Sequence, residues 1–372
     1  MRISCVIQSL GPGGSERQMV NLVKGLTQKG NQCQLILFSK KIHYRPELEN
    51  LPIVVKSIQI SSETGYLNFH LKLIKEATKR ISLFRPNIIQ SFLPLPNLVS
   101  ALCGKLTKIP VIISERNVDT PMTNLGRWLR IFFYRFSNLM TCNSEAVKEW
   151  SNRFYRFPLE KIQVVPNGID LKKFSGMRNL SPSGTSPRTS SGTSSGTYLI
   201  LTVASFKPQK GHKYLLAALP GIIRNFPQVR CIFLGEGGGQ KAELEKLVKS
   251  LNLSEFVSFK EKVGNLENFY QEATVFCLPS LAEGMPNAVM EAMAHGLPVV
   301  ATKVGGNQEL VVNNHTGFLV PPIDPTSLTL AINRLLENPI LRRTFGENAK
   351  EHTVRFTEIL PELFLDSERI FE

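Results

Sequence analysis

The chain alternates between two hydrophobic patterns. Apolar runs of about four to eight residues are typical of buried strands, and longer segments with an apolar residue at roughly every third or fourth position are typical of helices. In the segment 15–29, Met19, Leu22, Val23 and Leu26 fall on one helical face. This alternation of strands and helices predicts a parallel α/β sheet. In the first half of the chain we expect strands at 2–9, 34–38, 88–92, 109–114 and 139–143, and helices at 15–29, 67–84, 96–105 and from 144.

The same alternation starts again at Tyr198, after a change in composition. The segment 175–197 is dominated by Ser, Gly, Thr and Pro, which is typical of a mobile linker without a core. In the second half we expect strands at 198–204, 229–234, 257–259, 275–278 and 299–301, and helices at 212–226, 243–251, 287–295 and from 264, 325 and 355. We therefore divide the chain into a Rossmann-like domain at 1–168, a linker or insertion at 169–197, a second Rossmann-like domain at 198–354, and a terminal helix at 355–372.

The composition fits a globular protein with two cores. Of the 372 residues, 42% are hydrophobic and 20% are charged, and no apolar run reaches the roughly 18 to 20 residues that span a bilayer. The first apolar run is short and ends in a glycine turn, so we expect a strand there and no signal peptide. The six cysteines lie singly and form no C-x-x-C pair. This predicts neither a zinc site nor disulfides, and it fits a reducing cytoplasm.

The net charge of +14 is concentrated in the first half. Residues 1–168 carry 23 Lys and Arg against 10 Asp and Glu, a net +13, whereas residues 169–372 carry 21 against 20, a net +1. A basic surface attracts nucleic acids, anionic membranes or anionic substrates. We find no nucleic-acid-binding motif, so we expect no nucleic-acid partner.

The segment 127–136, RWLRIFFYRF, interleaves Arg127, Arg130 and Arg135 with aromatic and aliphatic residues. The default interpretation is an ordinary helix that buries its aromatic side on the sheet. The alternative is an interfacial helix, with its aromatic residues in the headgroup zone and its arginines on anionic lipid. The basic first half favours the alternative, and each interpretation can account for part of the helix.

The strongest candidate chemistry lies in the segment 278–311. The helix expected at 287–295 is apolar on nearly every side, yet it carries Glu291, and a buried carboxylate is costly unless it finds hydrogen-bond donors. A second carboxylate, Glu283, lies in the loop that enters this helix, where the backbone amides from 284 to 288 form a seat for an anion. Two carboxylates beside an anion seat indicate a ligand site. The alternative is that Glu291 only caps a neighbouring loop and that Glu283 is a solvated loop residue.

Two places in the first half are further candidates. The glycine turn after the first strand can hold phosphate through backbone amides. Its sequence, GPGGSE, is not G-x-G-x-x-G, and no acidic residue ends the second strand, which argues against a dinucleotide site. The polar run Glu115-Arg116-Asn117 follows the strand at 109–114, and parallel sheets bind ligands at the carboxyl ends of their strands.

The sequence EGMPNAVMEAMAHGLPVVAT at 283–302 resembles the signature of the retaining glycosyltransferases of the GT-B fold, group 1 (family four), with their Glu-x7-Glu motif. The match is long and specific, whereas two glutamates at this spacing alone would not be. The resemblance implies an α/β GT-B fold, in which two Rossmann-like domains face each other across a cleft and the terminal helix returns to the first domain. It also implies sugar transfer from a nucleotide diphosphate sugar with retention at the anomeric carbon.

The resemblance assigns roles to individual residues. Glu283 is the catalytic candidate near the donor sugar, and Glu291 would accept hydrogen bonds from the nucleotide ribose. Ser205 stands where the family has an arginine, and Lys207 compensates only partly because lysine lacks the bidentate fork. The remaining donor-binding candidates are Lys210, Gly235, Gly284, Met285, Asn287 and Glu309. The GGxER and SERN runs assign Gly13, Gly14, Arg17, Glu115, Arg116 and Asn117 to the acceptor side of the cleft. No histidine here matches the one that many members carry in this region.

We therefore expect a retaining glycosyltransferase that moves a hexose or N-acetylhexosamine, from a UDP-sugar, to a lipid-linked or cell-envelope glycan. The sequence has no Asp-x-Asp motif, and we expect neither a metal nor a cofactor. The expected location is the cytoplasm, peripheral on the inner face of an anionic membrane. One alternative, a non-catalytic nucleotide-sugar-binding or partner subunit, is kept open by Ser205. The Glu-x7-Glu motif argues against an NDP-sugar 2-epimerase, and the missing glycine fingerprint argues against a Rossmann oxidoreductase.

Overall fold

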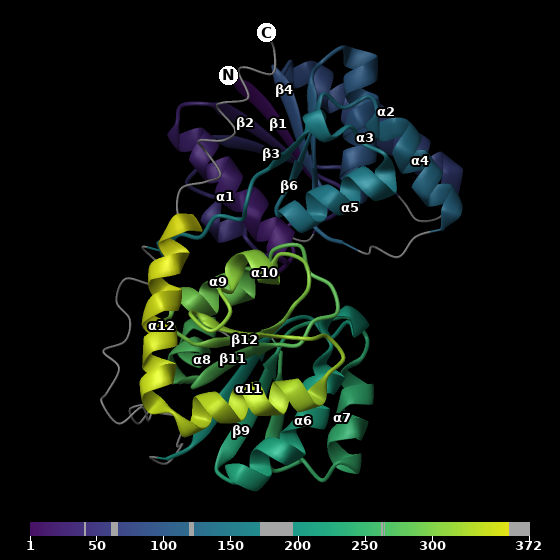
Figure 1. Ribbon diagram of the computed structural model, residues 1–372. Helices are drawn as coiled ribbons and strands as arrows, with labels where there is room; N and C mark the ends of the chain where they lie inside the picture. Colours follow the sequence, from purple (N-terminus) through teal and green to yellow (C-terminus); the bar gives the residue numbers. More distant parts are fainter. Residues whose placement is uncertain are drawn as a thin grey trace. The chain divides into compact units, whose positions relative to one another are not determined.

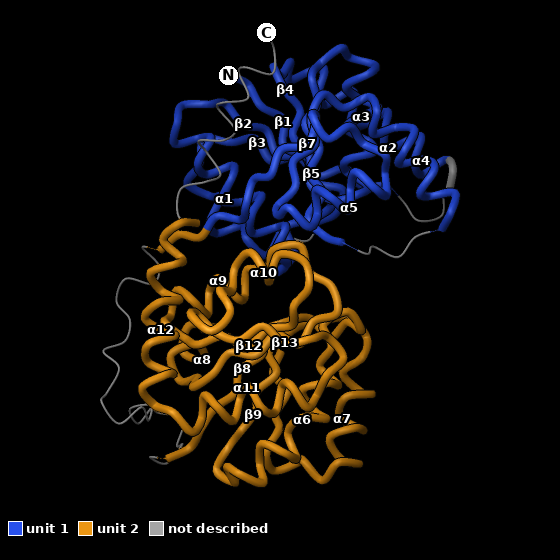
Figure 2. The backbone as a smooth tube through the Cα atoms, in the orientation of Figure 1, with its two compact units in different colours: residues 1–168, 358–372 blue, residues 169–357 orange. Residues whose placement is uncertain are grey.

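The chain forms two compact units, which divide between Gly168 and Ile169 (Figure 2). The computed structural model describes residues 1–40, 42–60, 66–118, 123–171, 196–261, 263 and 265–356, without the side chains of 66 and 67. Within these residues each unit is a parallel sheet covered by helices (Figure 1). Of the linker expected at 169–197, residues 172–195 lie outside the described residues, and so does the terminal helix expected at 355–372 beyond Phe356.

The first unit contains a seven-stranded sheet in the order β3-β2-β1-β4-β5-β6-β7, and every neighbouring pair is parallel. Its strands are β1 (Arg2–Ile7), β2 (Gln32–Leu37), β3 (Ile53–Ser57), β4 (Ile88–Phe92), β5 (Val111–Glu115), β6 (Leu139–Cys142) and β7 (Ile162–Val164). Its described helices are α1 (Gly14–Gln28), α2 (Tyr66–Phe84), α3 (Pro94–Thr107), α4 (Asn124–Tyr134) and α5 (Glu145–Tyr155), with 3-10 turns at Arg45–Glu47 and Leu159–Lys161.

Two cores sandwich this sheet because alternate residues of each strand point to opposite faces. Cys5 and Ile7 of β1 pack in the core that also holds the apolar face of α1, whereas Val6 packs in the core beneath α2, α3 and α5. The predicted apolar face of α1 is confirmed, since Met19, Leu22, Val23 and Leu26 are all buried.

The second unit contains a six-stranded parallel sheet in the order β10-β9-β8-β11-β12-β13. Its strands are β8 (Tyr198–Val203), β9 (Val229–Leu234), β10 (Val257–Lys260), β11 (Val275–Leu278), β12 (Val299–Thr302) and β13 (Gly317–Val320). Its described helices are α6 (His212–Asn225), α7 (Lys241–Ser250), α8 (Leu266–Glu272), α9 (Asn287–Ala294), α10 (Asn307–Leu310), α11 (Pro325–Glu337) and α12 (Pro339–Thr353), with 3-10 turns at Pro208–Lys210 and Val354–Phe356.

The order of strands reverses beside the first strand of each sheet. β1 lies between β2 and β4, and β8 lies between β9 and β11. This is the doubly wound, Rossmann-like arrangement, in which ligands bind outside the carboxyl ends of the strands that flank the reversal. The predicted α/β class with two Rossmann-like domains is confirmed, and in the second unit the point of reversal lies between the loops that follow β8 and β11.

Several predicted bounds need correction. The edge strands β3, β7 and β13 were missed, and in β3 Val54 and Val55 are exposed and the apolar run stops at Lys56. Glu115 is the last residue of β5 rather than part of the following loop. The helical pattern from 325 divides into α11 and α12 at Asn338, whose side chain caps the second helix by accepting from the Leu341 amide. The glycine turn expected at 305–309 continues into the short helix α10.

Candidate active site

Two loops of the second unit are tied together at the point of reversal. The loop after β8 contains a 3-10 turn that ends at Lys210, and the loop after β11 leads to α9. The Leu281 amide donates to the Gln209 carbonyl at 2.7 Å, and the Gln209 side chain donates to the Ala282 carbonyl at 2.8 Å. These two hydrogen bonds hold Lys210 beside the segment that begins at Glu283.

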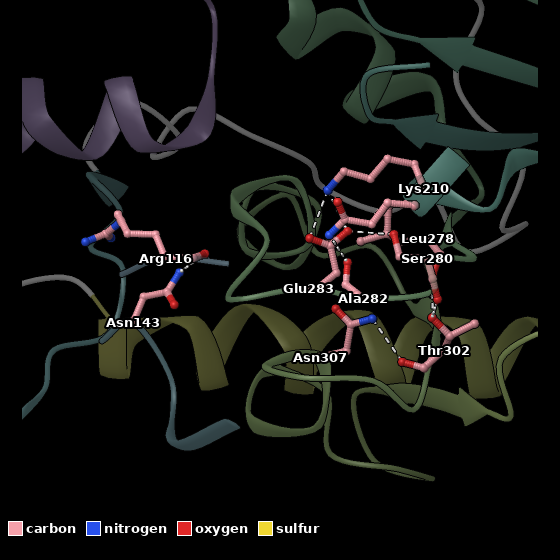
Figure 3. Close-up of polar contacts among 10 residues, drawn as sticks. Arg116, Asn143, Lys210, Leu278, Ser280, Ala282, Glu283, Thr302 and Asn307 are labelled. Atoms are coloured by element: carbon pink, nitrogen blue, oxygen red, sulfur yellow. Dashed lines mark hydrogen bonds and ion pairs between the residues drawn. The ribbon is translucent and has the colours of Figure 1, made fainter. Parts of the chain in front are cut away.

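Lys210 and Glu283 form an ion pair between these loops (Figure 3). The ammonium group lies 2.7 Å from Oε1 and 2.9 Å from Oε2 of the carboxylate. The Ser280 hydroxyl donates to Oε1 at 2.6 Å. Since only 3% of Glu283 is exposed, the alternative that this carboxylate is solvated is wrong. The site holds a buried anion and a less buried cation in fixed positions, an arrangement that can bind or stabilise charge on a ligand.

The loop that carries Glu283 is packed against a glycine turn. A Cβ atom at Gly305 would lie 1.9 Å from the Glu283 carbonyl oxygen, and the Gly306 amide donates to the Gly284 carbonyl at 2.8 Å. Only glycine allows the two backbones to approach so closely. The turn leads into α10, which carries Glu309.

Below the same loop, the Thr302 hydroxyl at the end of β12 donates a hydrogen bond to the Ser280 carbonyl at 2.5 Å (Figure 3). The Asn307 amide group donates in turn to the Thr302 carbonyl at 2.9 Å. Ser280 is therefore fixed on both its backbone and its side chain, which orients its hydroxyl toward Glu283.

Glu291, the second carboxylate of the motif, is held by a different residue. The Tyr270 hydroxyl on α8 donates to Glu291 Oε2 at 2.9 Å. The Tyr270 ring stacks on His295 with the ring centres 4.8 Å apart, and His295 Nδ1 lies 2.7 Å from the Glu291 carbonyl oxygen. Glu291 is half-buried, as are Asn287 and Ala288 one turn earlier, whereas the other residues of α9 are buried. The carboxylate thus points to the one side of α9 that is not enclosed by core.

The other donor-binding candidates fall into two groups. Ser205 and Lys207 lie in the loop after β8, where Ser205 is half-buried and Lys207 is exposed. Gly235 packs against this loop, since a Cβ atom there would lie 1.9 Å from the Ala204 carbonyl oxygen. The second group adjoins Glu283: Gly284 and Met285 are buried in its loop, and Asn287 opens α9.

His212 opens α6, two residues after Lys210. Its ring is buried near the Phe206 and Phe233 rings, each at a centroid distance of 5.5 Å. Burial, together with the charge of Lys210, lowers the pKa of His212 to about 4. The imidazole is therefore neutral at physiological pH and adds no charge to the loop.

In the first unit, the carboxyl end of β5 carries the buried Glu115. Its carboxylate accepts hydrogen bonds from the Tyr134 hydroxyl at 2.8 Å and from Asn97 Nδ2 at 3.2 Å. Burial raises the pKa of the Glu115 carboxyl above its usual value of 4.5. Tyr134 belongs to α4, so this carboxylate joins the end of the strand to the helix outside it.

Arg116, the next residue, is buried on the other side of the strand end. Its guanidinium donates to Asn167 Oδ1 and lies 4.5 Å from the centre of the Phe92 ring. The Asn143 amide donates to the Arg116 carbonyl at 3.2 Å (Figure 3). Burial lowers the pKa of Arg116 to about 10, so the side chain stays charged at neutral pH. Asn117 is exposed.

The GGxER run lies at the start of α1. Gly13 precedes the helix as its N-cap, Gly14 is its first residue, and the Arg17 guanidinium lies 5.2 Å from the centre of the Tyr44 ring. The next residue, Gln18, exchanges two hydrogen bonds with Gly168, at 2.9 and 3.0 Å. The start of α1 is thus tied to Gly168, after which the chain enters the second unit.

Family models match almost the whole chain. The model "Glycosyltransferase Family 4" matches residues 12–173, and the model "Glycosyl transferases group 1" matches residues 186–352. The chain is a group 1 glycosyltransferase. The prediction of an enzyme of this class is confirmed, and the Lys210–Glu283 pair lies within the part matched by the group 1 model.

Relatives and solved structures agree with this assignment. The glycosyltransferase is 26% identical to the UDP-Gal:alpha-D-GlcNAc-diphosphoundecaprenol alpha-1,3-galactosyltransferase of Escherichia coli over 288 residues, 73% of each chain. It is 27% identical to the N-acetylgalactosamine-N,N'-diacetylbacillosaminyl-diphospho-undecaprenol 4-alpha-N-acetylgalactosaminyltransferase of Campylobacter jejuni over 96% of each chain. The crystal structure of Anabaena HepE with UDP-glucose superposes with a TM-score of 0.86 at 22% identity over 99% of each chain. The fold is therefore GT-B.

Two further observations concern metals and membranes. Within the described residues, no three His, Cys, Asp or Glu side chains gather closely enough to hold a metal ion. Among the described helices, none combines the length and the apolar character that crossing a bilayer requires.

Proposed function

We propose that the glycosyltransferase moves a hexose or N-acetylhexosamine from a UDP-sugar to a lipid-linked glycan, with retention at the anomeric carbon. The Escherichia coli relative is named for a UDP-galactose donor and a diphosphoundecaprenol acceptor, and the Campylobacter relative for a diphospho-undecaprenol acceptor. The observation that carries the proposal is the Lys210–Glu283 pair, fixed by Ser280 at the reversal of the sheet.

In the proposed reaction, the bond between the anomeric carbon and the diphosphate breaks, and UDP leaves with the electron pair. A hydroxyl of the acceptor forms the new bond on the same face of the sugar, and its proton passes to the departing phosphate oxygen. Lys210 and the first turn of α9 stabilise the charge that develops on the diphosphate, without a metal ion. Glu283 lies near the sugar, where its carboxylate stabilises positive charge at the anomeric carbon.

The other candidates take supporting roles in this proposal. Glu291, oriented by Tyr270, accepts hydrogen bonds from the ribose hydroxyls. The donor is lined by seven further residues: Ser205, Lys207, Gly235, Gly284, Met285, Asn287 and Glu309. The acceptor is bound by Glu115, Arg116 and Asn117 and, at the start of α1, by Gly13, Gly14 and Arg17. We further propose that the enzyme works in the cytoplasm, peripherally on an anionic membrane, because such an acceptor is held there by its lipid.

The test is a panel of nucleotide sugars, with release of UDP measured in the presence and absence of an undecaprenyl-diphosphate-linked N-acetylhexosamine. The proposal expects release with a UDP-sugar that depends on the lipid acceptor, and large losses in the Glu283→Ala and Glu291→Ala variants. Glu337→Ala is the matched control, because Glu337 is an exposed carboxylate at the end of α11. Full activity in both motif variants would refute the site. Binding of UDP without turnover on any donor would favour the non-catalytic subunit that Ser205 keeps open.

A further inference from the structure

Helix α4 exposes an apolar stripe instead of burying it. The stripe consists of Leu125, Trp128, Leu129 and Phe132, whose exposed fractions are 70%, 58%, 38% and 49%. Residues at positions i, i+3, i+4 and i+7 share one face of a helix. The default interpretation of the segment 127–136, a helix that buries its aromatic side on the sheet, is therefore wrong for Trp128, Leu129 and Phe132. We call the four residues of the stripe the α4 face.

The opposite side of α4 is anchored in the fold. The Tyr134 hydroxyl donates to Glu115, Arg130 donates to the Tyr155 hydroxyl at 3.1 Å, and Arg127 Nε donates to the Phe154 carbonyl at 3.2 Å. The helix packs between α3 and α5 at the edge of the first unit (Figure 1). Because these contacts fix its orientation, α4 cannot rotate to bury its outer face.

Three basic side chains lie against aromatic rings in the α4 face or next to it. Arg135 lies 5.0 Å from the Phe132 ring centre, Arg156 lies 6.0 Å from that of Trp128, and Lys105 lies 4.0 Å from that of Phe136. We call Lys105, Arg135 and Arg156 the basic rim. Within the described helices α3 and α4, no side chain is acidic.

We infer that the α4 face and the basic rim dock the enzyme on an anionic lipid surface. Tryptophan, phenylalanine and leucine enter the boundary between headgroups and acyl chains, while arginine and lysine remain at the level of the phosphates. The net charge of +13 on residues 1–168 adds long-range attraction to the same surface. A second copy of the chain is a poorer occupant, because two basic rims would face each other.

This inference deepens the proposed function, since it gives the surface by which the enzyme would reach an acceptor anchored in the membrane. The two can nevertheless fail separately, because binding to vesicles requires no turnover. An enzyme that binds vesicles but transfers no sugar would refute only the proposed function. An enzyme that transfers sugar but does not bind vesicles through α4 would refute only this inference.

The experiment is flotation of the full-length protein with vesicles of phosphatidylcholine, alone or mixed with phosphatidylglycerol. We expect binding to the mixed vesicles, weaker binding to phosphatidylcholine alone, and loss of binding as salt rises and screens the basic rim. The Trp128→Ser/Phe132→Ser variant should lower the partition coefficient by at least about tenfold, because each aromatic side chain buries a large apolar area. The Arg135→Glu/Arg156→Glu variant should abolish the preference for phosphatidylglycerol.

Matched controls lie in the second unit. Ile340→Ser removes an apolar side chain that is 79% exposed, and Lys246→Glu/Lys249→Glu reverses two exposed charges on α7; neither should change flotation. Because all these positions are exposed, the variants should fold, which thermal unfolding checks. Wild-type protein that floats with neither vesicle overturns the inference, as does binding that the α4 variants leave unchanged. Self-association that disappears in the Trp128→Ser/Phe132→Ser variant, without vesicle binding, would show that a second copy covers the α4 face.

Discussion

Replacing Glu283 with glutamine is expected to tighten the binding of UDP while it impairs sugar transfer. Lys210 forms an ion pair with Glu283, and its ammonium group lies 2.7 and 2.9 Å from the two carboxylate oxygens. A diphosphate that binds Lys210 must compete with this carboxylate and lie near its negative charge. Glutamine removes that charge, keeps the shape of the side chain, and still offers Ser280 an acceptor.

The structure sets the size of the effect. Two unit charges about 2.8 Å apart attract by roughly 1.5 kcal/mol at the dielectric constant of water and by about 6 kcal/mol at an effective value of about 20. The pair lies between these limits, since 21% of the Lys210 side chain and 4% of the Glu283 side chain are exposed. Even the lower limit corresponds to about tenfold in affinity. We therefore expect the Kd of UDP to fall by about tenfold or more, and sugar transfer to fall on the order of 100-fold.

Titration calorimetry with UDP measures the binding, and acceptor-dependent release of UDP measures the transfer. Glu291→Gln is the matched control, since it makes the same substitution eight residues away but should weaken UDP binding by removing a ribose acceptor. Lys210→Met should weaken binding as well. If UDP binds folded Glu283→Gln no more tightly than the wild-type enzyme, Lys210 does not hold the diphosphate and the proposed donor site is wrong.

Three further predictions concern stability. Ser280→Ala should lower the calorimetric melting midpoint on the order of 5 °C, because it removes a hydrogen bond to a buried carboxylate, and no change would mean that the bond is dispensable. Gly211→Ala should lower the free energy of unfolding by at least about 3 kcal/mol, and Gly237→Ala by about 1 kcal/mol. Both glycines have φ of +65°, but a Cβ atom at 211 would lie 2.0 Å from a carbonyl oxygen, whereas a Cβ atom at 237 would have nothing within 4 Å. Equal losses in denaturant unfolding would contradict this close packing. The pKa of Glu115 is raised in the folded state, so the stability that the protonated carboxyl contributes is present below pH 4.5 and is lost as the pH rises through the folded-state pKa. Across that window the melting temperature of Glu115→Gln should rise relative to that of the wild type. A difference in melting temperature that does not depend on pH would contradict this.

The fold could be predicted because its signal is local and repeated. In both sheets the interior strands are mostly buried, so they read as short apolar runs, and the bounds expected at 88–92, 229–234 and 275–278 match β4, β9 and β11. The edge strand β3 does not carry this signal, because its outer residues face solvent. Periodicity therefore finds the centre of a sheet more reliably than its margin.

The candidate site could be predicted only in part, because its hydrogen bonds join distant residues. The spacing of Glu283 and Glu291 is visible in the sequence, but Lys210 lies 73 residues before the carboxylate that it pairs with, and Tyr270 lies 21 residues before Glu291. Lys210 was identified by resemblance alone, and Tyr270 was missed. Ser280 carried one weak signal, since it lies in the same loop, three residues before the carboxylate that it holds.

Helix α4 illustrates a different limit of sequence analysis. Its periodicity indicates which residues share a face, but both faces are apolar: Ile131 and Tyr134 pack inward, whereas Trp128 and Phe132 face outward. Which face covers the core depends on neighbours that the pattern does not contain. Here the hydrogen bond from Tyr134 to Glu115 selects the inner face.

The same hydrogen bond joins two features that look independent in the sequence, the polar end of β5 and the aromatic–basic helix. Glu115 is a candidate for acceptor binding, and the helix that supplies its hydroxyl donor is the one that we infer to touch the membrane. A change at Tyr134 would disturb both the carboxylate and the orientation of α4, so it cannot separate the two roles. Changes at Trp128 and Phe132 can, because these side chains are exposed and take no part in the hydrogen bond to Glu115. If changes at Trp128 and Phe132 impair acceptor use only when vesicles are present, the effect therefore comes from the lipid surface and not from Glu115.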